Sequence, residues 1–313
     1  MQKRVAVLAF LILIFANSID VLSEENSLKW IPFIWQSDTI SGKFVEKAYM
    51  YVPVKIDDLP ENFTMQLDLG TTDTQFYGNS VKPYIAAYPS FAKKLGSYET
   101  YQNVIFNGIN LKMGSSNFLF DVWLRSGFGD TIPRDSLHSR TAKHIGTIAP
   151  DLFKDKILII DYKTARFAVA EQLPAEFKSL SGVTFEINNG MIILPFKING
   201  VVHKLLFDTG SSPFALASSK SRALEIAGPL IIDSLSGPLW WGQQITFYGL
   251  NVNKSVELGV YKLGKSKVYY DKDGLWERDV FKPLNIWGLA GNGLFLDCVI
   301  ILDYKNKLFM IKN

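Results

Sequence analysis

The stretch Leu205-Leu206-Phe207-Asp208-Thr209-Gly210-Ser211-Ser212 carries a carboxylate from an apolar run into a tight turn. Gly210 has no Cβ, so the backbone can turn close to Asp208, and the neighbouring hydroxyl groups can donate hydrogen bonds around it. A single turn of this kind could simply cap the end of a strand, because these are all common turn residues. The stretch Met65-Gln66-Leu67-Asp68-Leu69-Gly70-Thr71-Thr72 repeats the pattern 140 residues earlier. The repetition favours a shared chemical role.

The two aspartate turns belong to a longer internal repeat. Each follows a β-like run with the order apolar, Pro, apolar, Lys, Ile, and each precedes a glycine step and a closing strand that ends in Asp-Tyr-Lys. The landmarks of the first half are 50–56, Asp68, Gly146 and Asp161, and those of the second half are 192–198, Asp208, Gly288 and Asp303. The closing aspartates follow the turn aspartates by 93 and 95 residues. Landmarks at matched spacing predict two homologous halves.

With these landmarks in this order, the chain resembles the pepsin-like aspartic proteases, and each half is similar to a retroviral-type protease monomer. The resemblance extends over about 43–313, almost the whole mature chain. It implies an all-β, bilobal acid protease fold with two pseudo-twofold related, β-barrel-like lobes. We expect the N-terminal lobe at 28–172, a linker at 173–181 and the C-terminal lobe at 182–313. The polar linker could instead connect two strands within one domain.

The resemblance implies that Asp68 and Asp208 form a catalytic pair that shares one proton. Two carboxyl groups within about 3 Å of each other cannot both hold a negative charge. The ionised partner would take a proton from water, and the protonated partner would donate to the scissile carbonyl oxygen. Water would then attack without a covalent enzyme intermediate. Because the pair titrates jointly, the sequence does not show which aspartate acts as the acid and which acts as the base.

The resemblance also implies supporting roles for residues beside the two aspartates. These supporting residues are Gly70, Thr71, Thr209, Gly210 and Ser211. The hydroxyl groups of Thr71 and Ser211 would hydrogen-bond the catalytic carboxylates, and Thr209 would belong to an interlocking threonine pair beneath them. Leu69 occupies the place of the second threonine and cannot donate. We therefore expect that either Thr209 finds a backbone partner alone, or the pair is held less rigidly.

The family closes a tyrosine-bearing flap over the substrate. Tyr98 and Tyr101 precede the apolar run at Val104 at the matching place, so both are candidates for the flap tyrosine. The chain has no recognisable Tyr-Gly flap sequence.

Three functions follow from these patterns. The leading hypothesis is an aspartic endopeptidase that binds an extended polypeptide substrate in a cleft between its lobes. The alternative is a catalytically impaired pepsin-like module that binds peptide or a partner protein, which Leu69 and the missing flap sequence favour. A third is an unrelated all-β protein that binds envelope sugars through Trp240, Trp241 and the tyrosines.

Composition excludes several other classes. The formal net charge of +3 comes without a basic run, so nothing supports nucleic-acid or membrane-surface binding. His138, His144 and His203 have no spacing that suits a metal, and we interpret each as a surface or supporting residue. No glycine-rich phosphate loop is present. We therefore expect neither metal nor cofactor, and a monomer.

The N-terminus predicts export. Residues 1–18 have the features of a signal peptide: a basic start at Lys3 and Arg4, an apolar run over 5–16, and small residues at the cleavage region. An uncleaved anchor is the alternative, although the run is shorter than a typical spanning helix of about 20 residues. The protein would then be periplasmic, envelope-associated or secreted. Cys298, the only cysteine, excludes an internal disulfide and is expected to be a small buried hydrophobe.

Overall fold

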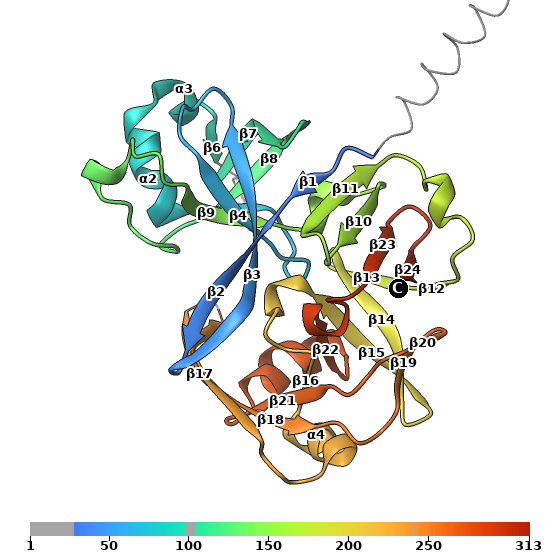
Figure 1. Cartoon of the computed structure of the whole chain (residues 1–313). Coiled ribbons are helices and arrows are strands. Elements are labelled where there is room, and N and C mark those ends of the chain that lie inside the picture. Colours follow the sequence, from blue (N-terminus) through green and yellow to red (C-terminus); the bar gives the residue numbers. More distant parts are fainter. Residues whose placement is uncertain (1–27, 98–103, 241) are drawn as a thin grey trace, which may run out of the picture.

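The computed structural model describes residues 28–97, 104–240 and 242–313 (Figure 1). The chain is mostly β, with three sheets in the part described, and the expectation of an all-β protein is confirmed at this level. The predicted signal peptide at 1–18 lies outside the described residues. Within those residues, no helix combines the length and apolar character needed to cross a membrane.

The first half of the chain builds an eight-stranded sheet. Its strands, in spatial order, are β2 (Ile34–Ile40), β3 (Lys43–Ile56), β4 (Phe63–Leu67), β9 (Lys143–Ile148), β5 (Gln75–Tyr77), β8 (Ser116–Arg125), β7 (Val104–Met113) and β6 (Leu95–Ser97). Two helices follow β5: α2 (Gly78–Ala87) and α3 (Pro89–Ala92).

The second half builds a ten-stranded sheet. Its strands, in spatial order, are β17 (Asp233–Trp240), β18 (Gln243–Asn251), β21 (Lys267–Asp271), β16 (Leu216–Ser218), β22 (Gly288–Gly291), β15 (Val201–Asp208), β14 (Met191–Ile198), β19 (Val256–Leu258) and β20 (Tyr261–Lys262), with β13 (Glu186–Asn188) paired to β14. Helix α4 (Lys220–Ala227) belongs to this half. Shorter helices lie at η5 (Glu277–Phe281) and α5 (Lys282–Leu284).

The same sequence of strand pairings occurs in both halves. The strand that leads to the aspartate turn runs parallel to the strand with the glycine step, as β4 with β9 and β15 with β22. That second strand is antiparallel to the strand after the turn, which is β5 or β16. The strand after the turn also runs parallel to one further strand, as β5 with β8 and β16 with β21. This shared topology is what a duplicated sequence predicts.

A third sheet contains the closing strands of both halves. Its order is β1 (Ile31–Pro32), β11 (Arg166–Ala170), β10 (Ile157–Asp161), β23 (Val299–Asp303), β24 (Leu308–Lys312) and β12 (Gly182–Thr184). Strands β10 and β23 are antiparallel, and Ile159 pairs with its repeat equivalent Ile301. Equivalent residues that pair with each other define a local twofold axis at this point.

Two local features depart from what the sequence pattern predicts. The apolar alternation around Gly108 predicts a pair of strands, but Val104–Met113 is one strand with a bulge near Gly108, where φ is +59°. Helix α2, which follows β5 directly, was not expected. Its missing helix signals explain this: Tyr77 at the N-cap makes no side-chain capping hydrogen bond, and Pro83 lies inside the helix.

Strand β3 has one face in the core and one face outside it. Alternate residues of its second half are buried, among them Met50 and Val52. The residues between them, including Tyr49 and Tyr51, face the opposite side of the strand and are half-buried. One strand thus supplies both core residues and half-buried aromatic side chains on its other face.

The β2–β3 hairpin extends from the first half to β17 of the second half (Figure 1). Its turn residue Ser41 accepts a hydrogen bond of 2.6 Å from the backbone N–H of Ser236. Beside it, Lys43 forms an ion pair with Asp233. Ile40 is buried among second-half core residues that include Met191 and Leu206. The two halves are therefore joined at this hairpin as well as through the third sheet.

Replacing Asp233 with asparagine should lower the free energy of unfolding by about 2 kcal/mol at neutral pH. Burial alone would raise the pKa of Asp233, but hydrogen bonds from Lys267, Lys43 and Tyr269 outweigh it and lower that pKa. A depressed carboxyl pKa stabilises the fold above about pH 4, the unfolded value, and the contribution is lost as the pH falls through the folded value. The difference in free energy of unfolding between Asp233→Asn and the wild type should therefore become smaller in strong acid.

Denaturant unfolding at several pH values measures this. Glu171→Gln is the matched control, because Glu171 is exposed and its ion pair with Lys156 is expected to contribute little. Equal midpoints for the two variants at neutral pH would contradict the importance of Asp233.

Candidate active site

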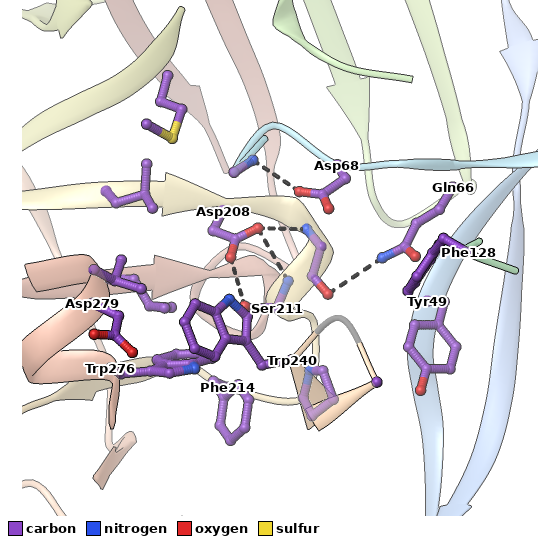
Figure 2. Close-up of a pocket in the computed structure, with 18 of the residues that line it drawn as sticks. Tyr49, Gln66, Asp68, Phe128, Asp208, Ser211, Phe214, Trp240, Trp276 and Asp279 are labelled. Atoms are coloured by element: carbon purple, nitrogen blue, oxygen red, sulfur yellow. Dashed lines mark hydrogen bonds between the residues drawn. The ribbon is translucent and has the colours of Figure 1, made fainter. Parts of the chain in front are cut away.

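The two aspartate turns meet in one cavity of about 530 Å³ (Figure 2). Asp68 follows β4, Asp208 ends β15, and both carboxyl groups line the cavity. Each is only partly exposed. The structure thus brings together the two residues that the sequence singled out.

Each turn glycine packs against the aspartate of the other half. A Cβ built on Gly70 would lie 2.3 Å from Cγ of Asp208, and one built on Gly210 would lie 2.4 Å from Cγ of Asp68. A side chain at either position would have to push the opposite carboxyl group aside, so glycine at both positions lets the two carboxyl groups lie where they do. Because the relation is reciprocal, each loop helps to place the carboxyl group of the other.

Asp208 is surrounded by donors from its own turn. Its Oδ1 accepts hydrogen bonds from the backbone N–H groups of Gly210 at 2.8 Å and Ser211 at 3.2 Å. Its Oδ2 accepts one from the Ser211 hydroxyl at 2.6 Å (Figure 2). Donors of this kind stabilise the ionised form of a carboxyl group. The hydrogen bond that we expected from the Ser211 hydroxyl to the Asp208 carboxylate is therefore present.

Asp68 has a poorer set of donors. Its Oδ1 accepts a hydrogen bond from the backbone N–H of Gly70 at 2.9 Å. Among the described residues, no hydrogen bond joins the Thr71 hydroxyl to Asp68, so the contact expected of Thr71 is not made. Burial, the charge of Asp208 and a side-chain hydrogen bond with Asp208 together raise the pKa of Asp68 well above its usual range. The surroundings therefore favour the proton on Asp68 and the negative charge on Asp208.

Thr209 makes hydrogen bonds to the backbone, which was one of the two outcomes expected in the absence of a second threonine. Its hydroxyl donates to the carbonyl oxygen of Leu67 and accepts from the backbone N–H of Leu69, each at 2.9 Å. The side chain of Leu69 is fully buried in the core. Thr209 alone thus bonds the turn around Asp68, because Leu69 at the equivalent position of that turn has no hydroxyl group.

The walls of the cavity differ in character on its two sides. The second half contributes large apolar side chains: Leu206, Phe214, Trp240, Trp276 and Leu289. The first half contributes polar aromatic groups at Tyr49, Tyr77 and His144, together with the apolar ring of Phe128. Tyr77 lies 5.4 Å from His144, centroid to centroid, and its hydroxyl lies 2.5 Å from that of Thr147.

His144 was expected at the surface or in a supporting role, and the structure places it in the cavity wall. It stacks on Tyr51 with ring centroids 4.2 Å apart and planes 5° from parallel. Burial lowers the pKa of His144 to about 4, so the imidazole is neutral except in strong acid. The pairing of β4 with β9 places it there, a long-range contact with no short-range sequence signal.

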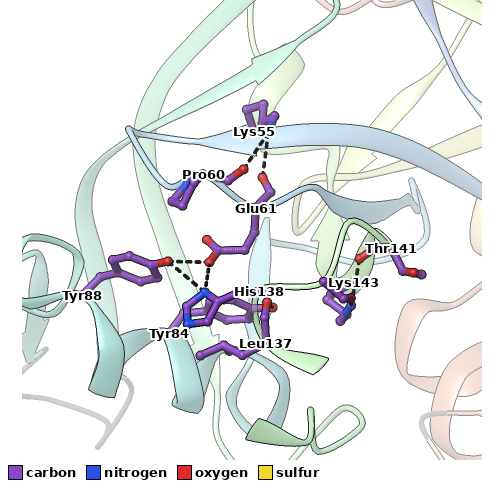
Figure 3. A network of polar contacts seen from close by, with 10 residues as sticks. Lys55, Pro60, Glu61, Tyr84, Tyr88, Leu137, His138, Thr141 and Lys143 are labelled. Atoms are coloured by element: carbon purple, nitrogen blue, oxygen red, sulfur yellow. Dashed lines mark hydrogen bonds and ion pairs between the residues drawn. The ribbon is translucent and has the colours of Figure 1, made fainter. Parts of the chain in front are cut away.

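The other two histidines lie outside this cavity. His138 forms a 2.9 Å contact through Nδ1 with Oε1 of Glu61, a buried carboxylate that also accepts from Tyr88 (Figure 3). His203 packs beside Trp287, with ring centroids 5.5 Å apart. Within the described ranges, no group of three or more His, Cys, Asp or Glu side chains is arranged to hold a metal ion.

The flap candidates Tyr98 and Tyr101 lie outside the described residues, in the segment that joins β6 to β7. The corresponding hairpin of the second half is β17–β18, because β7 and β18 occupy equivalent places beside β8 and β21. Trp240, at the end of β17, lines the cavity near Asp208. Trp241 is also outside the described residues.

No protein-family model matches this chain, and a search of curated proteins finds no match.

Proposed function

We propose that this chain is an aspartic-type endopeptidase with the bilobal, pepsin-like arrangement, which hydrolyses peptide bonds through Asp68 and Asp208. The observation that carries the proposal is the reciprocal packing of each turn glycine against the opposite carboxyl group. That packing holds two acids side by side in a cavity, as activation of water between them requires. The repeated strand topology and the local twofold at Ile159 and Ile301 support the bilobal arrangement.

The surroundings of the two acids assign them different tasks. Asp208, with three donors on its carboxylate, is the base that takes a proton from water. Asp68, whose pKa is raised, is the acid that donates to the scissile carbonyl oxygen. When the tetrahedral intermediate breaks down, Asp208 gives the proton that it took from water to the leaving amine nitrogen as the C–N bond breaks. Asp68 takes a proton back from a hydroxyl group of the intermediate, so the pair returns to its starting state after each cycle.

The substrate is an extended polypeptide that lies across the cavity. The apolar side chains around Phe214, Trp240 and Trp276 suit a large hydrophobic side chain next to the scissile bond. Export through a signal peptide at 1–18 is part of the same proposal.

Incubation of the mature chain with a mixed peptide library, from acidic to neutral pH, tests the proposal. Cleavage that a statine-type transition-state mimic inhibits would support it. Absence of cleavage at every pH, from protein shown to be folded, would favour the alternative that the module only binds peptide or a partner protein.

Ser211→Ala should lower kcat up to about tenfold, the effect of one lost hydrogen bond. The Ser211 hydroxyl donates to the Asp208 carboxylate, so its loss leaves the negative charge of the proposed base less stabilised. The rate should fall at high pH in both proteins as the proton is lost from Asp68, whose raised pKa extends activity above the usual carboxyl range.

Thr71→Ala is the matched control, because Thr71 is the repeat equivalent of Ser211 and makes no such bond in the described structure. Its kcat should match that of the wild type. If both variants lower kcat equally, the assignment of Asp208 as the base is wrong.

A further inference from the structure

Asn292 is a fully buried polar residue that contacts the turn after Asp208. It begins the short helix η6 (Asn292–Leu294) immediately after β22. Its Nδ2 donates to the carbonyl oxygen of Thr209 at 2.8 Å and to Oγ of Ser212 at 2.6 Å. Its Oδ1 accepts a 2.7 Å hydrogen bond from the hydroxyl of Tyr162, which comes from the first half of the chain. Such a connected and satisfied network rigidifies its surroundings.

The hydrogen bond to Thr209 acts on Asp208 through one peptide unit. The carbonyl of Thr209 and the N–H of Gly210 belong to the same planar peptide and point in opposite directions. Fixing the carbonyl toward Asn292 therefore directs the N–H toward the carboxyl groups. That N–H donates to Oδ1 of Asp208 at 2.8 Å, and it also lowers the pKa of Asp68 against the larger effects that raise it.

We propose that Asn292, oriented by Tyr162, is a positioning residue for the aspartate pair. It holds the Thr209–Gly210 peptide so that the Gly210 N–H stabilises the negative charge on Asp208. The kinetic part of this inference rests on the proposed peptidase function, whereas the electrostatic part does not. Since the Thr209 hydroxyl binds Leu67 and Leu69, the threonine is held from both halves at once. These contacts from both halves compensate for Leu69, which stands where a second threonine would be expected.

The repeat shows that the network exists on one side only. The residue equivalent to Asn292 in the first half is Pro150, which has no side-chain donor. The residue equivalent to Tyr162 is Tyr304, which is also buried but whose hydroxyl has no hydrogen-bond partner among the described residues. The peptide before Gly70 therefore lacks the anchor that its counterpart before Gly210 has. This difference matches the richer donor set of Asp208.

The pair of tyrosines provides a matched experiment. Tyr162→Phe removes the hydrogen bond to Asn292, and Tyr304→Phe removes a buried hydroxyl that has no partner. Tyr162→Phe should lower kcat up to about tenfold, the effect of one lost hydrogen bond, with KM changed less than about twofold. It should also raise the apparent pKa values of the aspartate pair, followed by NMR titration of chain labelled with ¹³C at the aspartate carboxyl groups. Tyr304→Phe should change neither.

Asn292→Ala removes the anchor itself and should have a larger effect on both readouts, with thermal unfolding used to confirm that it folds. Equal kcat values and superimposable titration curves for Tyr162→Phe and Tyr304→Phe would overturn the inference. If the wild type cleaves no peptide, the proposed function fails separately, and the titration alone decides. A shift in Tyr162→Phe that is absent in Tyr304→Phe would then still support Asn292 as the residue that sets the charge on the pair.

Discussion

Replacing Asp208 with asparagine is expected to abolish peptide hydrolysis, with kcat/KM falling by at least about 10²-fold. Asparagine keeps the size of the side chain and can still accept from Gly210, but its amide cannot take a proton from water. Replacing Asp68 should be equally severe, because an amide cannot deliver a proton to the scissile carbonyl oxygen. The two losses should not add in the double variant, since both residues serve one proton-transfer unit.

Asp121→Asn is the matched control for general effects of removing an aspartate. Asp121 also accepts from a glycine N–H at 2.8 Å, that of Gly108, but it is exposed and outside the cavity. Its variant should cleave at the wild-type rate. Hydrolysis that survives in Asp68→Asn and Asp208→Asn at the level of this control would show that a different site, or a contaminant, is responsible.

Stability measurements separate lost chemistry from lost folding. The pKa of Asp68 is raised in the folded chain, so ionising it costs free energy as the pH rises above about 3.9, the unfolded value. Asp68→Asn removes this cost and should unfold at an equal or higher denaturant concentration near neutral pH. An inactive variant that is no less stable than the wild type would identify Asp68 as a group that serves chemistry at the expense of stability.

The sequence predicted the central residues of the site because duplication makes them visible. Asp68 and Asp208 each follow an apolar run and precede a glycine, and a pattern that occurs twice at matched spacing has few explanations other than a repeated unit. The shared topology of β4–β9–β5 and β15–β22–β16 follows from the same duplication.

What the sequence did not predict depends on departures from the repeat. Thr71 and Ser211 are equivalent in sequence, yet only the serine hydroxyl bonds its aspartate. Asn292 and Pro150 occupy equivalent positions, and only the asparagine can anchor a peptide. Such differences arise from side-chain packing in three dimensions. A comparison of the two halves could have drawn attention to these positions, but it could not have given the contacts.

The β2–β3 hairpin illustrates a second limit. Its alternating pattern predicts a strand from Tyr49 onward, but nothing local indicates that Ser41 and Lys43 contact residues nearly 200 positions away. Contacts at that separation are set by how the halves associate. The same holds for His144, which reaches the cavity only because β9 pairs with β4.

Gly146→Ala should destabilise the fold severely, by about 3 kcal/mol or more. A Cβ on this residue would lie 2.2 Å from the backbone carbonyl oxygen of Gln75 on β5. Backbone in the middle of a sheet cannot move aside as a flexible side chain can, so the strands must separate. Since β9 also pairs with β4, the strand that leads to Asp68, the substitution should disturb the cavity as well.

The repeat makes the same prediction for Gly288, where a Cβ would lie 2.2 Å from the carbonyl oxygen of Ala217 on β16. Gly146→Ala and Gly288→Ala should therefore lose similar amounts of stability in denaturant unfolding. Gly264→Ala is the control, because Gly264 is exposed and has no atom within 4 Å of an added Cβ. Its free energy of unfolding should stay within about 0.5 kcal/mol of the wild-type value. If Gly146→Ala matched this control while Gly288→Ala unfolded, the glycine steps would not be equivalent structural elements. Matched losses at both steps would show instead that each half depends on the same close approach of two strands, next to the strand that leads to its aspartate.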